Sequence, residues 1–394
     1  MRPLGRLRAA RDSIPANVRS LSWVSFANDL SSQLAYPIVP LFLTVTLGAP
    51  VAVLGLIEGV AEGVSVGLRG IAGGLSDRHG GRRLPWVTAG YVATALSRPL
   101  LAVAPGWGVV LGARLLDRTG KAIRTAPRDA LLRDSTPDDR LGAAFGYHRM
   151  MDTAGAVLGP LVAVGLLALG LSLRGALWFT LVPALATLVL VRRVAEAPPR
   201  PRTVRAAGSP RVALPRSLVL PLGILTIFAL GNSSDVFLLL RAHDLGLSTT
   251  LVVLAYATYN LVSALLAWPL GTLSDRIGRA RLLAVGIAVF GLVYLAFAAG
   301  PPTWALWPLF AVYGLYTAAT AGVAKAWIAD RAGTAGAGAV YGVLASATGA
   351  ALLIASVAAG LLWSHVGHAA PFLAGTASAT AALVGLAVAR FMPS

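Results

Sequence analysis

The chain has 394 residues, of which 56% are hydrophobic and only 12% are charged, and it contains no cysteine. A soluble protein of this length divides into domains that carry far more charged surface. The lack of cysteine excludes disulfides, thiolate metal sites and cysteine nucleophiles. Apolar runs repeatedly reach the roughly 20 residues that cross a bilayer, so the composition predicts an all-α membrane protein.

The net charge of +17 raises the question of nucleic acid, because strongly basic domains often bind it. The positive charge stands in the turns between apolar runs and does not form one patch. Almost all of it is arginine, since Lys121 and Lys325 are the two lysines of the chain. We interpret the charge as topological and expect no nucleic-acid partner.

Twelve apolar segments are expected to cross the membrane, in two groups of six: residues 21–47, 50–75, 84–104, 107–126, 143–169 and 174–193, then 217–241, 248–272, 281–300, 303–325, 338–363 and 370–390. Most of the arginine lies in alternate turns: 76–83, 127–142, 194–216, 273–281 and 326–337. The positive-inside rule therefore places these turns and both termini in the cytoplasm of a bacterial inner membrane.

The predicted domain organisation follows from these segments. Residues 1–20 form a cytoplasmic lead-in, 21–193 the N-terminal six-helix bundle, 194–216 a cytoplasmic linker and 217–394 the C-terminal six-helix bundle. The lead-in is rich in arginine, and no short apolar core with a small-residue cleavage site follows it. We therefore do not expect a cleaved signal peptide.

A charged turn is repeated in the two halves of the chain. The run Gly73-Gly74-Leu75-Ser76-Asp77-Arg78 returns as Gly271-Thr272-Leu273-Ser274-Asp275-Arg276, with the second Asp 198 positions after the first. Such a repeat indicates an internally duplicated membrane protein. The pattern G-x-L-S-D-R-x-G-R resembles the signature loop of the major facilitator superfamily, although the first copy has an extra Gly before its Arg pair.

The resemblance implies a major facilitator fold, with two six-helix bundles related by pseudo-two-fold symmetry and a binding site between them near the membrane midplane. It implies transport by alternating access, and we expect neither a cofactor nor a stable oligomer. In the family each signature Asp caps a neighbouring helix and pairs with an Arg, which locks the outward-facing state. The residues to which this gating role is assigned are Gly73, Asp77, Arg78, Arg82, Gly271, Asp275, Arg276 and Arg279.

Asp29 lies about nine residues into the first apolar segment, where a carboxylate costs several kcal/mol unless it is solvated or paired. Asn28 and Gln33 are its polar neighbours in the sequence. Pro37 and Pro40 are expected to break the helix and to free backbone groups that line a cavity. The arrangement resembles the first helix of drug:proton antiporters of the superfamily. A buried Asp held by Asn28 and serine hydroxyls is the structural alternative.

Two acidic residues of the second segment, Glu58 and Glu62, share a helical stripe with Arg69. An ion pair with Arg69 explains one of the two carboxylates but not both. We therefore predict that both glutamates belong, with Asp29, to the proton-coupling or substrate-binding groups. The equivalent positions of the second half carry no charge.

The fourth segment carries Arg114, Asp117 and Arg118 at helical spacing. Charges at this depth would face lipid if they lay on the outer surface, which is implausible. We predict an interior polar network that they share with the glutamates of the second segment. The following turn, 127–142, is expected to be mostly solvated and to make cytoplasmic gating contacts.

The fifth segment contains Gly146, Gly155, Gly159 and Pro160 at the spacing of the antiporter motif of the superfamily, which they resemble. Small residues followed by proline make a bendable helix interface, and by family analogy this favours export. Asp152 lies among them and is expected either to take part in coupling or to pair with a His or Arg one helical turn away.

The second half has fewer charged residues in its apolar segments. Asp235 is a predicted outer gate or substrate contact, and Tyr256, Asn260, Tyr313 and Tyr316 are predicted to line the cavity. Aromatic and hydroxyl groups of this kind suit an amphipathic ligand. Packing of the aromatic side chains against their own bundle is the structural alternative.

We therefore expect a proton-coupled antiporter that exports a small amphipathic compound or drug. Burial favours the protonated form of a carboxyl group and a nearby cation favours the ionised form, so a buried acid can exchange a proton for a substrate. Export of a metal ion or metal chelate through the same carboxylates is the first alternative. Uptake symport and a non-transporting sensor or scaffold are further alternatives, and no set of residues indicates an enzyme or a dedicated metal site.

Overall fold

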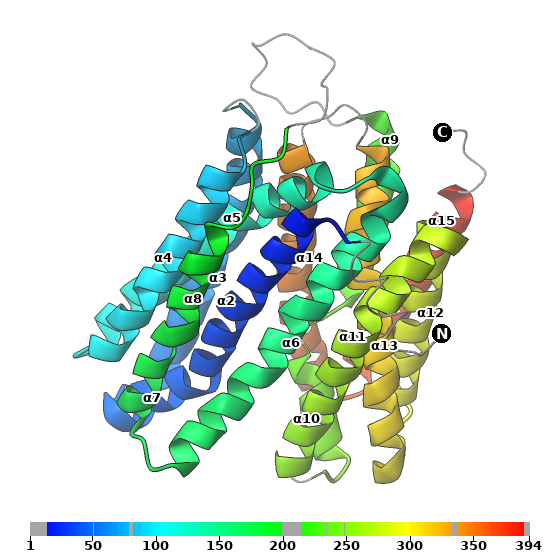
Figure 1. Cartoon of the computed structure of the whole chain (residues 1–394). Helices are drawn as coiled ribbons and strands as arrows, with labels where there is room; N and C mark the ends of the chain where they lie inside the picture. The colour runs from blue at the N-terminus through cyan, green and yellow to red at the C-terminus, as the bar shows by residue number, and fades with distance from the viewer. Residues whose placement is uncertain are drawn as a thin grey trace, which may run out of the picture. The chain divides into compact units, whose positions relative to one another are not determined.

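The computed structural model describes residues 14–49, 51–78, 82–198, 215–233, 235–247, 249–332 and 337–389. Every regular element in these residues is a helix, which confirms the all-α fold class (Figure 1). Six of the described helices combine the length and the apolar composition that are needed to cross a bilayer. The expected number of twelve spans stays a prediction.

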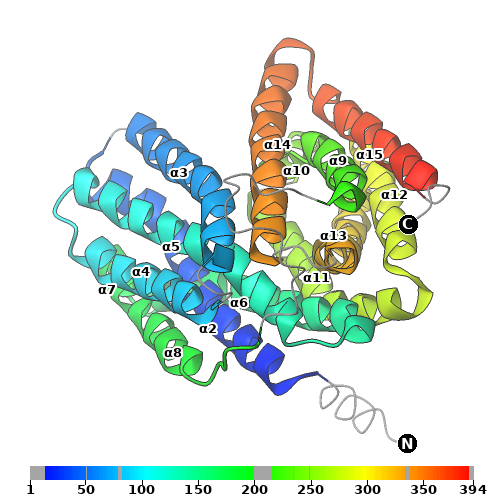
Figure 2. The same ribbon diagram turned by 90° about the horizontal axis from the view of Figure 1, so that it is seen from above.

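The chain divides into two compact units, and the first contains residues 1–138, 151–207 and 336–343. The elements that lie wholly within it are α2 (Ala16–Leu41), the π-helix η1 (Phe42–Thr46), α3 (Val51–Arg78), α4 (Leu84–Val103), α5 (Trp107–Asp134), α7 (Leu173–Phe179) and α8 (Leu181–Val191). In this unit α5 packs against both α3 and α4, and α2 packs against α8, as both views show (Figures 1 and 2).

The second unit contains residues 139–150, 208–335 and 344–394. Its own helices are α9 (Arg216–Gly231), α10 (Val236–Asp244), α11 (Thr249–Ile277), α12 (Arg279–Ala298), α13 (Thr303–Arg331) and α15 (Ala370–Ala389). The packing repeats that of the first unit, because α13 packs against α11 and α12, and α9 packs against α15. The two copies of the repeat therefore build the same helix pairs.

Two helices and one short turn contribute to both units. The first ten residues of α6 (Leu141–Ala168) belong to the second unit and the rest to the first. The opposite holds for α14 (Ala337–His365), whose first seven residues belong to the first unit. The 3-10 turn η2 (Asp138–Arg140) begins in the first unit and ends in the second. These assignments matter for the site, because each signature turn meets one of these helix starts.

The prediction that Pro37 and Pro40 break the first helix is wrong. Helix α2 continues to Leu41 and then changes into the π-helix η1, whose wider turn is marked by the Leu47 N–H donating to the carbonyl of Phe42 over 3.0 Å. Ile38, Val39, Phe42 and Leu43 are buried in an apolar cluster with parts of α4, α5 and α7. One face of this part of α2 therefore packs the core, whereas Tyr36 and Pro37 on it are exposed.

Three expected boundaries also differ from the structure. The fourth segment does not end at residue 126, because α5 continues through Pro127 to Asp134, and Arg124 and Asp129 are buried there. The turn that we expected at 127–142 is therefore mostly helix. The sixth segment is divided at Thr180 into α7 and α8, and the seventh is interrupted before Asp235, between α9 and α10.

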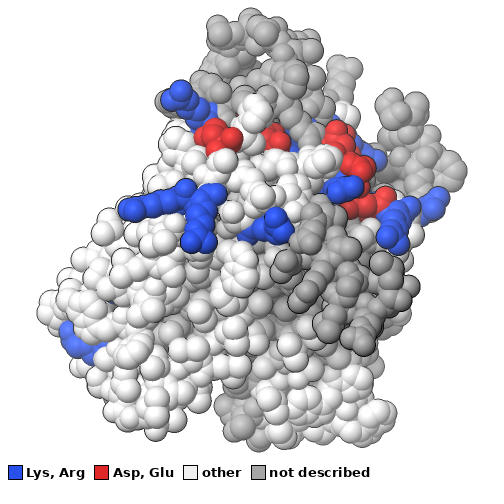
Figure 3. Space-filling view, in the orientation of Figure 1, with Lys and Arg blue, Asp and Glu red and all other residues white. Residues whose placement is uncertain are grey.

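Charged side chains of the described residues gather in one part of the face in Figure 3, and the lower part is almost bare of them. Two arginines, Arg174 and Arg241, lie by sequence in the turns that alternate with the arginine-rich ones. Arg174 donates to the carbonyls of Ala102 and Ala104 over 3.0 Å each, and Arg241 donates to the carbonyl of Phe297 over 3.2 Å. Both therefore cap the C-terminal end of a helix, α4 or α12, which explains why they depart from the charge asymmetry.

Candidate functional site

The first signature turn is a carboxylate cap on another helix. Asp77, near the end of α3, accepts hydrogen bonds from the backbone N–H groups of Gly338 over 3.3 Å and Ala339 over 2.6 Å, at the start of α14. The Arg83 guanidinium forms an ion pair with Asp77, and its Nε lies 3.3 Å from Asp134 Oδ2. Negative charge at a helix N-terminus satisfies free N–H groups and the helix dipole together.

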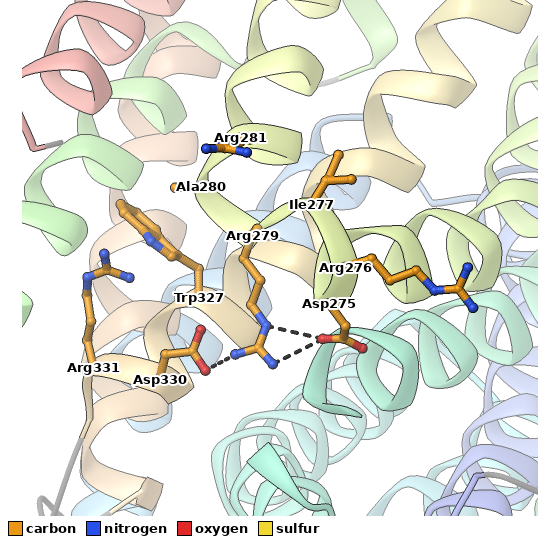
Figure 4. Close-up of a pocket in the computed structure, with 10 residues that line it drawn as sticks. Asp275, Arg276, Ile277, Arg279, Ala280, Arg281, Trp327, Asp330 and Arg331 are labelled. Atoms are coloured by element: carbon orange, nitrogen blue, oxygen red, sulfur yellow. Dashed lines mark hydrogen bonds and ion pairs between the residues drawn. The ribbon is translucent and has the colours of Figure 1, made fainter. Parts of the chain in front are cut away.

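The second signature turn repeats this cap. Asp275, near the end of α11, accepts hydrogen bonds of 2.8 Å from the N–H groups of Gly142 and Ala143, at the start of α6. The Arg279 Nη2 atom lies 3.0 Å from Asp275 Oδ1, and its Nη1 atom forms an ion pair with Asp330 (Figure 4). The turn therefore has the same three charged groups as its counterpart.

The first glycine of each of the two turns is needed because there is no room for a side chain at its position. A Cβ atom added at Gly73 would overlap the carbonyl of Gly338, and one added at Gly271 would overlap the carbonyl of Gly142. The backbone of each signature helix thus touches the backbone of the helix that its Asp caps. Any larger residue would push the two helices apart and lengthen the capping hydrogen bonds.

The sequence did not identify the arginine of the first turn correctly. We assigned the role to Arg82, which is exposed, whereas the buried Arg83 pairs with Asp77. Two adjacent arginines could fill the role of the signature Arg. The extra glycine before them obscured which of the two aligns with the Arg of the family pattern. The side chain of Arg78 and residues 79–81 lie outside the described part of the chain. The side chain of Arg276 is exposed, and in Figure 4 it points away from Arg279.

A second cluster brings two acids together in the first unit. The carboxyl groups of Asp29, on α2, and Asp152, on α6, lie within hydrogen-bonding reach of each other. The Asn28 amide donates to Asp29 Oδ1 over 3.0 Å. Lys121 and Arg124, both on α5, are cations that act electrostatically on Asp29. A carboxyl pair of this kind can hold one proton between its oxygens.

The glycines of α6 bring this helix against two neighbours. A Cβ atom at Gly155 would lie 2.5 Å from the carbonyl oxygen of Phe26, and one at Gly159 would lie 2.7 Å from the Leu34 nitrogen and equally close to the Cβ of Gln33. Both contacts are with α2. The third glycine, Gly146, faces α11 in the second unit. Pro160 follows within α6 and does not end the helix.

Asp117 is held by arginines from two helices. Arg98, on α4, donates to Asp117 Oδ1 over 2.9 Å and to the hydroxyl of Ser32 over 2.8 Å, and Arg114 lies 4.0 Å from Asp117 Oδ2. Arg98 and Asp117 are both buried. The predicted interior ion pair is thus present, but its principal cation is Arg98. In the sequence, Arg98 is a single Arg within an apolar segment. Arg118 is half-buried on the same helix.

The glutamate part of the predicted network cannot be compared with the structure. Glu58 and Glu62 lie on α3, and their side chains lie outside the described part of the chain. Arg69, on the same helix, donates to the hydroxyl of Ser65 over 3.0 Å. The roles of the two glutamates stay predictions.

The second unit has one acid among tyrosines, at the interruption between α9 and α10. Asp235 accepts hydrogen bonds from the hydroxyls of Tyr259 over 3.1 Å and Tyr313 over 2.8 Å. The Asn232 amide donates to the hydroxyl of Tyr316 over 2.9 Å. Both Tyr313 and Tyr316 are buried, so they are core residues as well as hydrogen-bonding groups.

The remaining two cavity residues that we predicted lie on α11. Tyr256 is 38% exposed and packs against Tyr259, with 5.4 Å between ring centroids. The Asn260 amide donates to the carbonyl of Tyr256 over 2.9 Å, which ties it to its own helix. Among the described residues no group of three or more His, Asp or Glu side chains could hold a metal ion.

The fold and the repeated caps agree with the comparisons to known proteins. The sequence profile of the Major Facilitator Superfamily matches residues 21–240 and again residues 219–394. The chain belongs to the major facilitator superfamily. It is thus a multi-pass membrane protein of a family of transporters, and not an enzyme.

Relatives within the superfamily share different lengths of the chain. The uncharacterized MFS-type transporter MJ1317 of Methanocaldococcus jannaschii is 34% identical over 355 residues, which is 88% of each chain. The multidrug resistance protein MdtH of Photorhabdus laumondii is 30% identical over 132 residues, or 34% of this chain. A bacterial homologue of the iron transporter ferroportin, solved in an outward-facing state, has a TM-score of 0.76 at 16% identity and covers 95% of this chain and 100% of its own; it shows the fold alone.

Proposed function

We propose that this transporter exports a small amphipathic compound in exchange for protons, by alternating access. The observation that carries the proposal is the approach of the Asp29 and Asp152 carboxyl groups, which are supplied by α2 and α6. Two carboxyl groups at this distance form a hydrogen bond only when one of them carries a proton, because two anions repel and neither has a hydrogen to donate. The pair is therefore the proposed proton carrier.

Proton release from this pair leaves two adjacent negative charges. Lys121 and Arg124 are placed to balance them, since both act electrostatically on Asp29 from α5. We propose that protonation and deprotonation of the pair shift the equilibrium between the inward-facing and outward-facing states, as differential stabilisation of two states requires.

The proposed substrate contact in the second unit is the interruption between α9 and α10. Interrupted helices expose backbone groups and polar side chains at membrane depth, which is where transporters of this kind bind their substrates. Here the interruption presents Asp235, Tyr259 and the partly exposed Tyr256. Aromatic faces beside a carboxylate suit a compound that has an apolar body and a polar or cationic group.

Two further observations support export. The glycines of the antiporter-like motif seat α6 against α2, beside the acid pair. The relative MdtH is named a multidrug resistance protein, and it matches a third of this chain. By the positive-inside rule we place the signature turns and both termini in the cytoplasm of the bacterial inner membrane. We propose that the protein works as a monomer, with lipid, proton and substrate as its partners.

Everted membrane vesicles test the coupling. After a proton gradient is established, a panel of amphipathic compounds is added and the collapse of the gradient is followed with a pH-sensitive dye. We expect a transported compound to dissipate the gradient with the wild-type protein and not with Asp29→Asn. Asp139→Asn is the matched control, because this carboxylate is 74% exposed and its ion pair with Arg140 lies at the surface. Substrate movement that is equally fast without a pH gradient would refute proton coupling.

A further inference from the structure

The start of α12 opens onto a cavity of about 570 Å³ (Figure 4). Its lining is unusually basic and consists of one continuous turn and the end of α13: Asp275, Arg276, Ile277, Gly278, Arg279, Ala280, Arg281, Trp327, Asp330 and Arg331. All of these residues belong to the second unit. The transport cycle proposed above does not use the cavity itself, although it uses Asp275 and Arg279 as a gate.

The equivalent helix of the first unit shows what such a helix start needs. Helix α4 begins directly after Arg83, and the Glu196 carboxylate accepts hydrogen bonds of 2.9 Å from the N–H groups of both Arg83 and Leu84. One carboxylate thus satisfies two free backbone donors and the positive end of the helix dipole. The chain supplies this anion from the segment that follows α8.

Helix α12 begins at the matching arginine, and within the described residues no carboxylate takes the place of Glu196. Its N-cap residue is Gly278, with φ of 98°, which has no side chain that could cap the helix. Ala280 is the counterpart of Leu84, and its N–H donates to no side chain in the described part of the chain. The two carboxylates of the cavity, Asp275 and Asp330, are both paired with Arg279.

Further donors line the same cavity. The Trp327 side chain is buried, and its Nε1–H has no hydrogen-bond partner among the described residues. The Arg331 guanidinium stacks on the Trp327 ring at 4.8 Å from its centroid, as Figure 4 shows. Arg281 is exposed beside Ala280. A buried indole N–H without an acceptor is costly, so an acceptor in the cavity would be bound favourably.

We propose that this cavity binds a phosphate group, which takes the place that Glu196 has in the first unit. A phosphate has several acceptor oxygens, and it can accept from a helix N-terminus, a guanidinium and an indole at the same time. The phosphate belongs either to an anionic lipid headgroup at the membrane surface or to a free phosphate ion. Phosphate binding at this site does not depend on the transported compound, so the binding proposal can be tested separately from the proposed transport function.

Thermal unfolding of the purified full-length protein in detergent tests the site. Inorganic phosphate is compared with chloride at equal ionic strength, and short-chain phosphatidylglycerol is compared with short-chain phosphatidylcholine, whose choline cancels the headgroup charge. We expect one anionic probe to raise the unfolding temperature of the wild type. A response to phosphate identifies the free ion as a ligand, and a response to phosphatidylglycerol alone identifies the lipid.

Variants of exposed arginines separate this site from general anion binding. Arg281→Gln should weaken the response about tenfold in probe concentration, as expected for the loss of one charge-assisted contact, whereas Arg281→Lys should retain most of it. Arg82→Gln is the matched control, since Arg82 is exposed beside the α4 start that Glu196 already caps. The proposal is overturned if no anionic probe stabilises the wild type, or if Arg281→Gln responds as strongly as Arg82→Gln.

Discussion

In the first unit Asp77 caps α14 and Arg83 joins it to Asp134; in the second unit Asp275 caps α6 and Arg279 repeats the link. The spacing between Asp and Arg is six residues in the first turn and four in the second. The charged contacts are thus kept although the loop length differs. The comparison teaches that the capped helix start, and not the loop, is the feature that both halves maintain.

The interiors of the two units differ more than their turns. The first unit holds the Asp29 and Asp152 carboxyl groups close together beside cations of α5. The second holds Asp235 among tyrosine hydroxyls at an interrupted helix. A shared carboxyl pair suits proton exchange, whereas a carboxylate in an aromatic surrounding suits a bound compound. The repeat therefore supports a division of tasks, and the following changes test it.

The largest expected effect is on transport, and it distinguishes the acid of the first unit from that of the second. Asp29→Asn should reduce transport driven by a proton gradient by tenfold or more, on the order expected when an essential proton carrier is removed, and should leave substrate counterflow intact. Asp235→Asn should weaken both processes, because it alters the proposed substrate contact. Gradient-driven uptake and counterflow are measured in the same proteoliposomes. Equal losses of both processes in the two variants would remove the division of tasks.

A change in the α6 glycines should act mainly on stability. Gly159→Val places a branched side chain against the α2 backbone, where a Cβ already lies 2.7 Å from the Leu34 nitrogen. Overpacking of this kind costs about 1–3 kcal/mol. Gly165→Val is the control on the same helix, because nothing lies within 4 Å of a Cβ there. Unfolding in a denaturing detergent should distinguish the two variants, and equal unfolding midpoints would contradict the close packing.

Removing the charge of either signature acid should lower the free energy of unfolding by a similar amount. Asp77→Asn and Asp275→Asn each remove a buried anion that faces an arginine and two helix N–H groups, and we expect each to cost about 3 kcal/mol. The free energy of unfolding of the two variants is the measurement. Arg83→Gln should reproduce the loss seen for Asp77→Asn, whereas Arg82→Gln should be silent. A stability loss confined to one of the two acids would show that the halves are not equivalent.

The repeat, the helices and the signature acids were predictable from the sequence because each depends on local pattern. Runs of apolar residues set the helices, and the recurrence of Gly and Asp at fixed spacing set the turns. The partners of these residues were not predictable. Asp152 meets Asp29, 123 positions away in the chain, and Arg98 meets Asp117 across two helices. Such contacts depend on how helices rotate about their axes, which the sequence pattern specifies only loosely.

The local errors have a related origin. Proline was expected to break α2, but the helix continues through both prolines to Leu41 before η1 begins. The segment after residue 126 looked like a solvated turn because it is rich in charge. The segment is nevertheless helical, and within it Arg128 and Asp129 pair with each other, 3.1 Å apart, with both side chains largely buried.

The smallest effect is expected where the two halves differ, at the starts of α4 and α12. Glu196→Gln keeps one acceptor oxygen and loses the other with the charge, so one of the N–H groups of Arg83 and Leu84 loses its partner. We expect a loss of about 1 kcal/mol, as for other helix caps, measured as a lower unfolding midpoint. Added phosphate should restore part of this stability, because the variant leaves one N–H group at the start of α4 without an acceptor. If phosphate stabilises the variant no more than the wild type, a helix start of this kind does not recruit an anion by itself, and binding at α12 depends on its extra donors, Arg281 and Trp327.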